Sequence, residues 1–233
     1  ECDPDKAFVE GRPYLVGCYD IQFDKDGFLQ EYRKIEAGDA AEHEKYYAYS
    51  KTNDPSGRYN FQTYVDIMQP EAIRRFIELT HERYYAACGQ EYGKSVPSIF
   101  SDEPRHEPLE QLSEAEEEQR ALYYWTYEFE DSFRERYGYS LVEQLPYLVW
   151  DTADQDYCYV RYHYFNHAQE LFEKAFFQPI SEVTRRQGIA FTGHLMNEHT
   201  LLGQISRTGD AMRLYPYFDI PGMDVLFDRV ELL

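Results

Sequence analysis

The sequence has 233 residues, 43% of them hydrophobic, which is enough for one large or two small domains with a sizeable core. Its net charge of −20 excludes a partner such as DNA or RNA, which would be repelled, and disfavours an anionic membrane surface. The four cysteines are scattered without a CxxC pair, and no apolar run reaches about 18 residues, so we expect no thiolate zinc site, no disulfide framework and no membrane span.

The first part of the chain predicts a β-hairpin followed by another strand. Residues 12–23 form an apolar, aromatic run, and the turn DKDG at 24–27 allows residues 28–35 to return as the hairpin partner. Residues 45–50 alternate in polarity, as a strand does, and residues 51–60 have the composition of a loop.

The clearest helix is predicted over residues 68–89. Pro70 suits the first helical turn, Glu71 suits the positive N-terminal end, and Gly89 suits the position after the C-terminus. Residues 95–101 then have the composition of a short, buried strand.

Long helices are predicted next. One is expected over 113–138, because Ser113 and Glu116 stand at the spacing of a capping box, and a short one over 140–150. A further long helix is expected over 154–188, with a kink at Pro179.

Two more strands are predicted near the end of the chain. Residues 188–194 form a short apolar run, and a helical or irregular stretch is expected around 198–215. Residues 217–227 predict a strand that leaves through a Pro-Gly corner.

Short apolar strands that alternate with long helices predict an α/β fold with a parallel sheet. A (β/α)8 TIM-type barrel and an open doubly wound sheet both fit, and the absence of GxGxxG and GxxxxGK[ST] makes nucleotide-binding versions less favoured. We count about four or five core strands, whereas a full barrel needs eight. We therefore predict one partial (β/α)8 barrel domain over residues 1–233, with a helical insertion at about 105–150.

Polar residues follow each of these short strands, and the loop before the first helix adds more. In a parallel α/β fold the carboxyl ends of the strands lie at one edge, where barrels carry the active site. The residues expected to converge there are Tyr64, Asp66, Asp102, Glu103, His194, Asn197, Glu198, His199, Asp219 and Asp224.

Converging carboxyl groups suit the hydrolysis of a glycosidic bond. One carboxyl group protonates the leaving oxygen, and the other activates water or attacks carbon. We predict Glu103 and Glu198 as this pair, because glutamate reaches further into a cleft than aspartate and both residues follow strands. The simpler interpretation is that Asp102 and Glu103 cap a helix or form salt bridges.

Four stretches in this order resemble the catalytic barrel of large glycoside hydrolases of the α-L-rhamnosidase type, glycoside hydrolase family 106 and its relatives. They are YVDIMQPEAIRRFIELTHERYYAACGQEYGKSVPSIFSDEP, GYSLVEQLPYL, GIAFTGHLMNEH and DIPGMDVL, and the similarity covers residues 60–226. Such enzymes are much longer and have flanking β-domains, so the resemblance implies that this chain is part of a longer parent chain.

The resemblance implies an inverting glycosidase that acts on glycosides of plant polysaccharides, with a carbohydrate as its partner. By resemblance, Glu103 is the acid and Glu198 a candidate base, while Asp66, His194 and Asp224 face the sugar. It also suggests a calcium ion near the sugar, although the reaction requires no cofactor. Rhamnose as the sugar is not fixed by these motifs.

Other functions fit parts of the sequence. A metal hydrolase could use oxygen and nitrogen ligands, but no HExxH or HxH motif occurs; a nucleophilic serine enzyme lacks the GxSxG motif. His163 and His167 are four residues apart on a predicted helix and favour packing over a metal pair. A non-catalytic carbohydrate-binding or scaffolding domain would use Trp125 and the tyrosines to stack on sugars. The candidate metal ligands are Asp102, His106, His194, Glu198 and His199.

Overall fold

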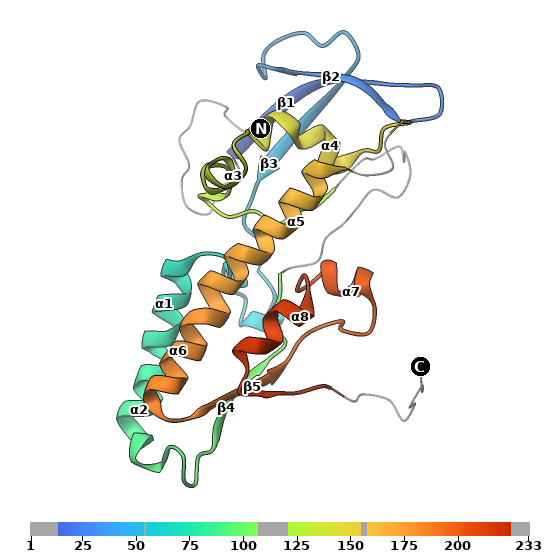
Figure 1. Ribbon diagram of the computed structural model, residues 1–233. Helices are drawn as coiled ribbons and strands as arrows, with labels where there is room; N and C mark the ends of the chain where they lie inside the picture. The colour runs from blue at the N-terminus through green and yellow to red at the C-terminus, as the bar shows by residue number, and fades with distance from the viewer. Residues whose placement is uncertain (1–13, 54, 107–120, 155–157, 225–233) are drawn as a thin grey trace. The chain divides into compact units, whose positions relative to one another are not determined.

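Figure 1 shows the computed structural model of the protein, which describes residues 14–53, 55–106, 121–154 and 158–224. The chain divides into two compact units. The first comprises Glu1–Val65 and Glu107–His167, and the second comprises Asp66–His106 and Ala168–Leu233. Within the described ranges, no helix combines the length and the apolar character that crossing a membrane requires.

The first unit contains a three-stranded antiparallel sheet. Strand β1 (Tyr14–Phe23) lies between β2 (Leu29–Ile35) and β3 (Glu44–Ser50). The predicted hairpin and third strand are therefore confirmed, but they do not belong to a parallel sheet. The physical reason is the short connections, because parallel neighbours need a crossover of about a dozen residues or more.

Aromatic side chains form the core of the first unit. The buried Tyr19 of β1 donates a hydrogen bond from its hydroxyl to the carbonyl of Val142, 2.5 Å away. The Trp150 ring meets the rings of Phe23 and Tyr46 edge to face, at 5.4 and 4.7 Å. The helical segments of this unit are η1 (Gly57–Tyr59), α3 (Phe129–Tyr137), η3 (Val142–Gln144), α4 (Leu145–Val149) and the first part of α5 (Tyr159–Phe172).

The helix predicted over 113–138 is much shorter than expected. Only α3 is helical, residues 121–126 are not, and residues 113–120, with the expected capping box, lie outside the described residues. The backbone of the non-helical stretch is used in tertiary contacts instead, since the Tyr124 carbonyl accepts a hydrogen bond from the buried Tyr164 hydroxyl at 2.7 Å. Tertiary hydrogen bonds thus override local helix propensity here.

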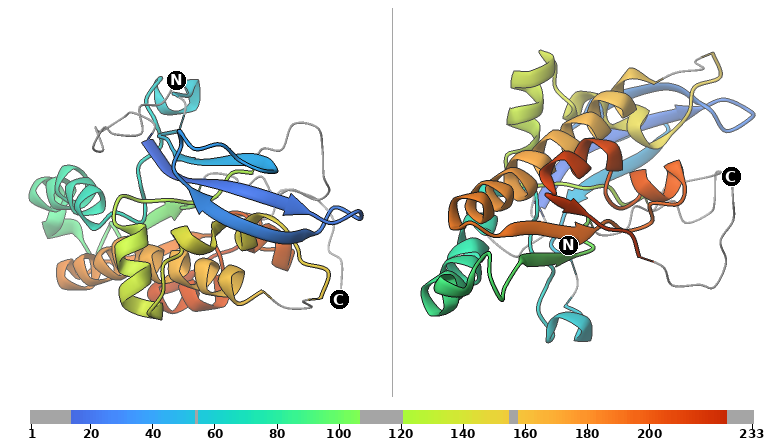
Figure 2. Two further views of the ribbon diagram at one scale, coloured as in Figure 1. Left: turned by 90° about the horizontal axis from the view of Figure 1, so that it is seen from above. Right: turned by 60° about the horizontal axis from the view of Figure 1, so that its bottom comes forward.

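The second unit contains a parallel sheet in the order β4–β5–β6 (Figure 2). Its strands are β4 (Ser98–Asp102), β5 (Ala190–His194) and β6 (Ile220–Pro221). The strands predicted over residues 95–101 and 188–194 are confirmed, and so is their parallel direction. Of the strand predicted over 217–227, the described residues contain only β6, which is parallel to β5, and residues 225–227 lie outside the described residues. The partial (β/α)8 barrel stays a prediction.

The long helices predicted for the second unit are both interrupted. The helix expected over 68–89 is divided into α1 (Pro70–Leu79) and α2 (His81–Cys88), followed by η2 (Gly89–Glu91). The break lies at Thr80, whose hydroxyl donates to the Phe76 carbonyl four residues earlier at 2.7 Å, a contact that bends helices.

The helix expected over 154–188 is also interrupted, near the predicted kink. After α5 comes η4 (Glu173–Phe177), a π-helical stretch, and then α6 (Gln178–Gln187), whose first turn contains Pro179. Because proline donates no backbone hydrogen bond, this wider turn precedes it. The remaining segments of the unit are α7 (Leu201–Ile205), α8 (Ala211–Leu214) and η5 (Tyr215–Tyr217).

A glycine allows β4 and β5 to pair closely. A Cβ atom added at Gly193 would lie 2.2 Å from the Ser101 carbonyl oxygen and 3.1 Å from the Phe218 ring. Since the Ser101 oxygen belongs to the backbone of β4, no side-chain rotation can relieve this overlap. The parallel pairing therefore depends on the missing side chain.

We expect Gly193→Ala to lower the free energy of unfolding by about 2 kcal/mol or more, because a methyl group would force the strands apart. Gly38→Ala is the matched control, since a Cβ there meets nothing within 4 Å. Urea unfolding monitored by circular dichroism measures both. Equal midpoints for the two variants would contradict this account of the sheet.

Candidate functional site

The carboxyl ends of the three parallel strands meet at one edge of the second unit's sheet. Asp102 at the end of β4 pairs with His194 at the end of β5. The next residue, Glu103, donates its backbone N–H to the His194 carbonyl at 3.2 Å, and Gly222 after β6 donates to the Gly193 carbonyl at 2.7 Å. The backbone hydrogen bonds therefore continue one residue past the strands and fix where the following side chains begin.

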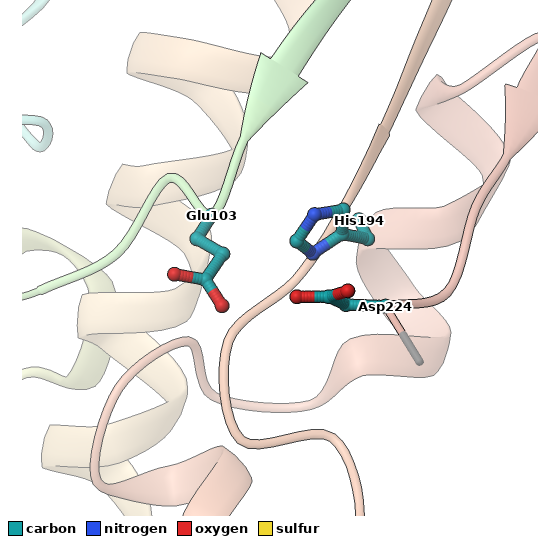
Figure 3. A group of neighbouring side chains, drawn as sticks. All are labelled: Glu103, His194 and Asp224. Carbon is teal, nitrogen blue, oxygen red and sulfur yellow. The ribbon is translucent and has the colours of Figure 1, made fainter. Parts of the chain in front are cut away.

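Three side chains come together at this edge: Glu103, His194 and Asp224 (Figure 3). One carboxylate oxygen of each acid and one ring nitrogen of the histidine all lie within 4.8 Å of one another. Glu103 is half-buried, His194 is 8% exposed, and Asp224 is exposed. The prediction that these strand ends converge is thus confirmed for three of the residues named from the sequence.

Glu103 has an unusual backbone conformation. Its φ of +49° lies in the left-handed region, which residues with a side chain longer than asparagine seldom adopt. Its carbonyl accepts a hydrogen bond from the Arg105 guanidinium at 3.3 Å. Strain of this kind, at the first residue after a strand, is found more often at functional sites than elsewhere.

His194 is held by an acid on one side only. Its Nε2 atom lies 3.1 Å from an oxygen of Asp102, whose side chain is 76% exposed. Its Nδ1 atom is buried and has no hydrogen-bond partner within the part of the chain that the structure describes. A buried nitrogen without a partner is costly, so this atom has the capacity to take a hydrogen bond or a metal ion.

Glu198, the predicted base, is not a member of this cluster. One of its carboxylate oxygens accepts hydrogen bonds from the Leu195 N–H at 2.8 Å and from the Tyr215 hydroxyl at 2.5 Å. Burial, together with this hydrogen bond to the Glu198 carboxylate, raises the pKa of the Tyr215 phenol well above its usual value. The structure therefore brings Asp224 to Glu103 and ties Glu198 into the turn after β5.

The other residues predicted for the second unit have varied positions. Asn197 lies in the turn after β5 with a left-handed φ of +58°, and His199 is exposed. Asp66 accepts a hydrogen bond from the Met68 N–H at 3.0 Å, in the turn that precedes α1. The expectation for Asp219 is wrong, because it lies before β6 and accepts the Phe191 N–H at 3.0 Å.

Two of the residues predicted to bind sugar belong to the first unit. The Tyr64 ring lies 5.1 Å from that of Tyr59. The Trp125 indole donates to the Tyr14 hydroxyl at 2.9 Å and stacks on Phe129 at 5.0 Å. Their role in binding a sugar stays a prediction.

The predicted histidine pair packs in the first unit as expected. The Tyr139 hydroxyl lies 3.0 Å from His163 Nδ1, and Ser132 Oγ lies 2.9 Å from His167 Nε2. In the second unit, the ring of His106 is buried, 4.9 Å from that of Phe172. His106, a candidate metal ligand, is thus packed in the core against an aromatic ring.

Sequence reasoning did not single out Tyr215. Its residue type and its place in the stretch YPY carry no signal for a contact with an acid 17 positions earlier. It also ranked Asp224 as a sugar-contacting residue rather than as the partner of Glu103. Only the position of β6 beside β5 brings Asp224 to the same edge.

Comparison with solved structures finds a distant likeness to a rhamnosidase from Novosphingobium sp. PP1Y, with a TM-score of 0.46 and 19% sequence identity. The alignment covers 72% of this chain and 14% of the rhamnosidase chain. No family model matches the sequence, and no curated protein matches it.

Burial gives His106 a defined effect on stability. Burial lowers the pKa of its ring to about 3, below the ordinary value of about 6.5. Between these two pH values the His106 ring is protonated in the unfolded chain and neutral in the folded chain. The free energy of unfolding therefore falls as the pH falls from about 6.5 to about 3.

We expect His106→Phe to retain the contact with Phe172 and to flatten this fall, because phenylalanine does not titrate. Thermal unfolding between pH 7 and pH 4 measures the difference from the unsubstituted protein. His199→Gln, at an exposed position, should leave the pH dependence unchanged. A steeper loss of stability in His106→Phe would contradict the assignment.

Proposed function

We propose that this chain carries the two reacting carboxyl groups of a glycoside hydrolase, Glu103 and Asp224. The observation that supports this most is their convergence within 4.8 Å at the carboxyl edge of a parallel sheet. Glycosidic bonds are hydrolysed by two carboxyl groups, one that is protonated and one that is ionised. Glu103 is half-buried and Asp224 is exposed, so the two carboxyl groups lie in different surroundings.

Glu103 is assigned as the general acid, which protonates the leaving oxygen, as the sequence resemblance implies. Asp224, exposed to water, is assigned as the carboxylate that attacks the anomeric carbon. The resulting glycosyl–enzyme ester is then cleaved by water, which Glu103 deprotonates, so that the acid becomes the base. His194, linked to Asp102, is placed to bind a sugar hydroxyl.

The separation of the carboxyl groups favours retention of configuration. Carboxyl groups about 5 to 5.5 Å apart are typical of retaining enzymes, whereas inverting enzymes leave about 6.5 to 9.5 Å for a water molecule. One carboxylate oxygen of Glu103 and one of Asp224 lie within 4.8 Å of each other, nearer to the former range than to the latter. The inversion implied by the family resemblance would instead require another base, such as Glu198.

The substrate class is proposed as a neutral glycoside, with α-L-rhamnosides of plant polysaccharides as the first candidate. A net charge of −20 disfavours anionic sugars. The rhamnose assignment comes from the sequence resemblance described above. A non-catalytic carbohydrate-binding domain is the outcome if the chain binds such sugars without hydrolysing them.

We expect Glu103→Gln and Asp224→Asn each to reduce hydrolysis of p-nitrophenyl α-L-rhamnoside by about 10²- to 10⁴-fold, since each removes a group needed in the reaction. Glu182→Gln, at an exposed position on α6, is the control and should retain full activity. Release of p-nitrophenol measures all three. Hydrolysis that persists in both site variants would refute the assignment.

The anomeric configuration of the first product shows whether Asp224 or Glu198 is the second reacting carboxyl group beside Glu103. If Asp224 attacks carbon, proton NMR should detect the retained anomer before mutarotation. An inverted first product would exclude Asp224 as the nucleophile and favour Glu198 as the base.

A divalent cation at the same three residues is a second candidate function. The buried Nδ1 atom of His194, without a partner among the described residues, supports it, because this cluster adds a nitrogen ligand to two carboxylates. Calcium prefers oxygen ligands alone, whereas manganese and zinc accept imidazole, so these residues fit the latter ions better than calcium. An ion held here would polarise a sugar oxygen and organise the two acids.

We expect titration calorimetry of the metal-free protein to detect one Mn²⁺ site, weakened at least tenfold by His194→Ala. His199→Ala, an exposed histidine outside the cluster, is the control. Tighter binding of Ca²⁺ than of Mn²⁺, or an equal effect of the two variants, would contradict a site that uses His194.

A further inference from the structure

Glu198 accepts two hydrogen bonds at a single oxygen atom. The donors are the N–H of Leu195, three residues earlier, and the hydroxyl of Tyr215 in η5. The contact with Tyr215, at 2.5 Å, is as short as a hydrogen bond from a phenol to an ionised carboxylate becomes. The donors come from two separate segments, so the carboxylate links the turn after β5 to η5.

Other contacts hold the same turn in place. The side-chain amide of Gln204 in α7 donates to the Glu198 carbonyl at 2.8 Å, and Leu195 is buried. Asn197, inside the turn, has a left-handed backbone conformation, which asparagine adopts more readily than most residues. The carboxylate of Glu198 therefore lies where it stabilises a turn of defined geometry.

The turn is connected directly to the cluster of Glu103, His194 and Asp224. Leu195, whose N–H the carboxylate holds, follows His194 in the chain. The His194 carbonyl in turn accepts the N–H of Glu103 at 3.2 Å. Covalent and hydrogen bonds thus connect the turn to His194 and, through its carbonyl, to the backbone of Glu103.

We infer that Tyr215 and Glu198 form a clamp that positions the end of β5, so that Glu198 acts on the site through this turn and Tyr215 is a positioning residue. The inference rests on the proposed function, because the residues that the clamp positions are Glu103, His194 and Asp224 of the proposed site. The direction of the pKa shift of the Tyr215 phenol agrees with it, because burial and the neighbouring carboxylate both hold the phenol protonated as a donor.

The clamp makes different demands on residue 198 than a catalytic base does. A glutamine there keeps a carbonyl oxygen that can accept from both the Leu195 N–H and the Tyr215 hydroxyl, whereas an alanine keeps neither contact. A catalytic base must take up a proton, which glutamine cannot do. Glu198→Gln therefore preserves a clamp and abolishes a base, while Glu198→Ala abolishes both.

The test compares Tyr215→Phe, Glu198→Gln and Glu198→Ala in the full chain by NMR. Tyr217→Phe, which changes a neighbouring tyrosine of η5, is the matched control. Two signals are followed: hydrogen exchange of the Leu195 amide, and the nitrogen chemical shifts of the His194 ring.

We expect Leu195 exchange to accelerate at least tenfold in Glu198→Ala and about fivefold in Tyr215→Phe, with altered His194 ring shifts in both. Glu198→Gln and Tyr217→Phe should resemble the unsubstituted protein. Exchange and shifts unchanged in Tyr215→Phe, or equal loss in Glu198→Gln and Glu198→Ala, would overturn the inference. If Tyr215→Phe does not fold, the two Glu198 variants still decide it.

Hydrolysis of the aryl rhamnoside by the same variants forms a separate measurement. A clamp predicts that Glu198→Gln retains activity within a few-fold, and a loss as large as in Glu198→Ala would contradict it. If no form of the protein hydrolyses glycosides, the proposed function fails, yet the exchange and chemical-shift results still support or refute the clamp.

Discussion

The close parallel pairing of β4 with β5 is the constraint on which the candidate site depends. Gly193 permits it, because any side chain at this position would meet the backbone of Ser101. The pairing sets Asp102 opposite His194, and one further hydrogen bond carries it to Glu103. Asp102 and Glu103, about 90 residues from His194 in sequence, therefore lie at the same edge of the sheet as that histidine.

This arrangement gives neighbouring acids different environments. The Asp102 side chain is exposed to water and contacts the buried imidazole of His194. Glu103, whose backbone has a left-handed conformation, is half-buried. Asp224 reaches the same place from the exposed end of β6. A fourth carboxylate, that of Glu198, accepts hydrogen bonds from the Leu195 N–H and the Tyr215 hydroxyl. The four acids near this edge thus differ in their exposure and in their hydrogen-bond partners.

The sequence was sufficient where the information is local. Apolar runs bounded by polar residues predicted β4, β5 and β6, and the polar residues after them predicted the edge of the site. It failed where contacts between separate segments decide: the Tyr124 carbonyl accepts a hydrogen bond from Tyr164, and Tyr215 meets Glu198 through the fold alone. It also missed the local hydrogen bond of Thr80 that accompanies the break between α1 and α2. The parallel sheet predicted from strands that alternate with helices is found in the second unit, whereas the strands of the first unit pair antiparallel, as their short connections require.

The left-handed backbone of Glu103 also limits which amino acids the chain can tolerate there. Glycine, asparagine or aspartate would adopt this conformation at lower cost, so each should yield a protein that resists heat better than the natural one. None of them extends a carboxylate as far as glutamate does. If Glu103 is the acid proposed above, stability and chemistry are therefore opposed at this one position.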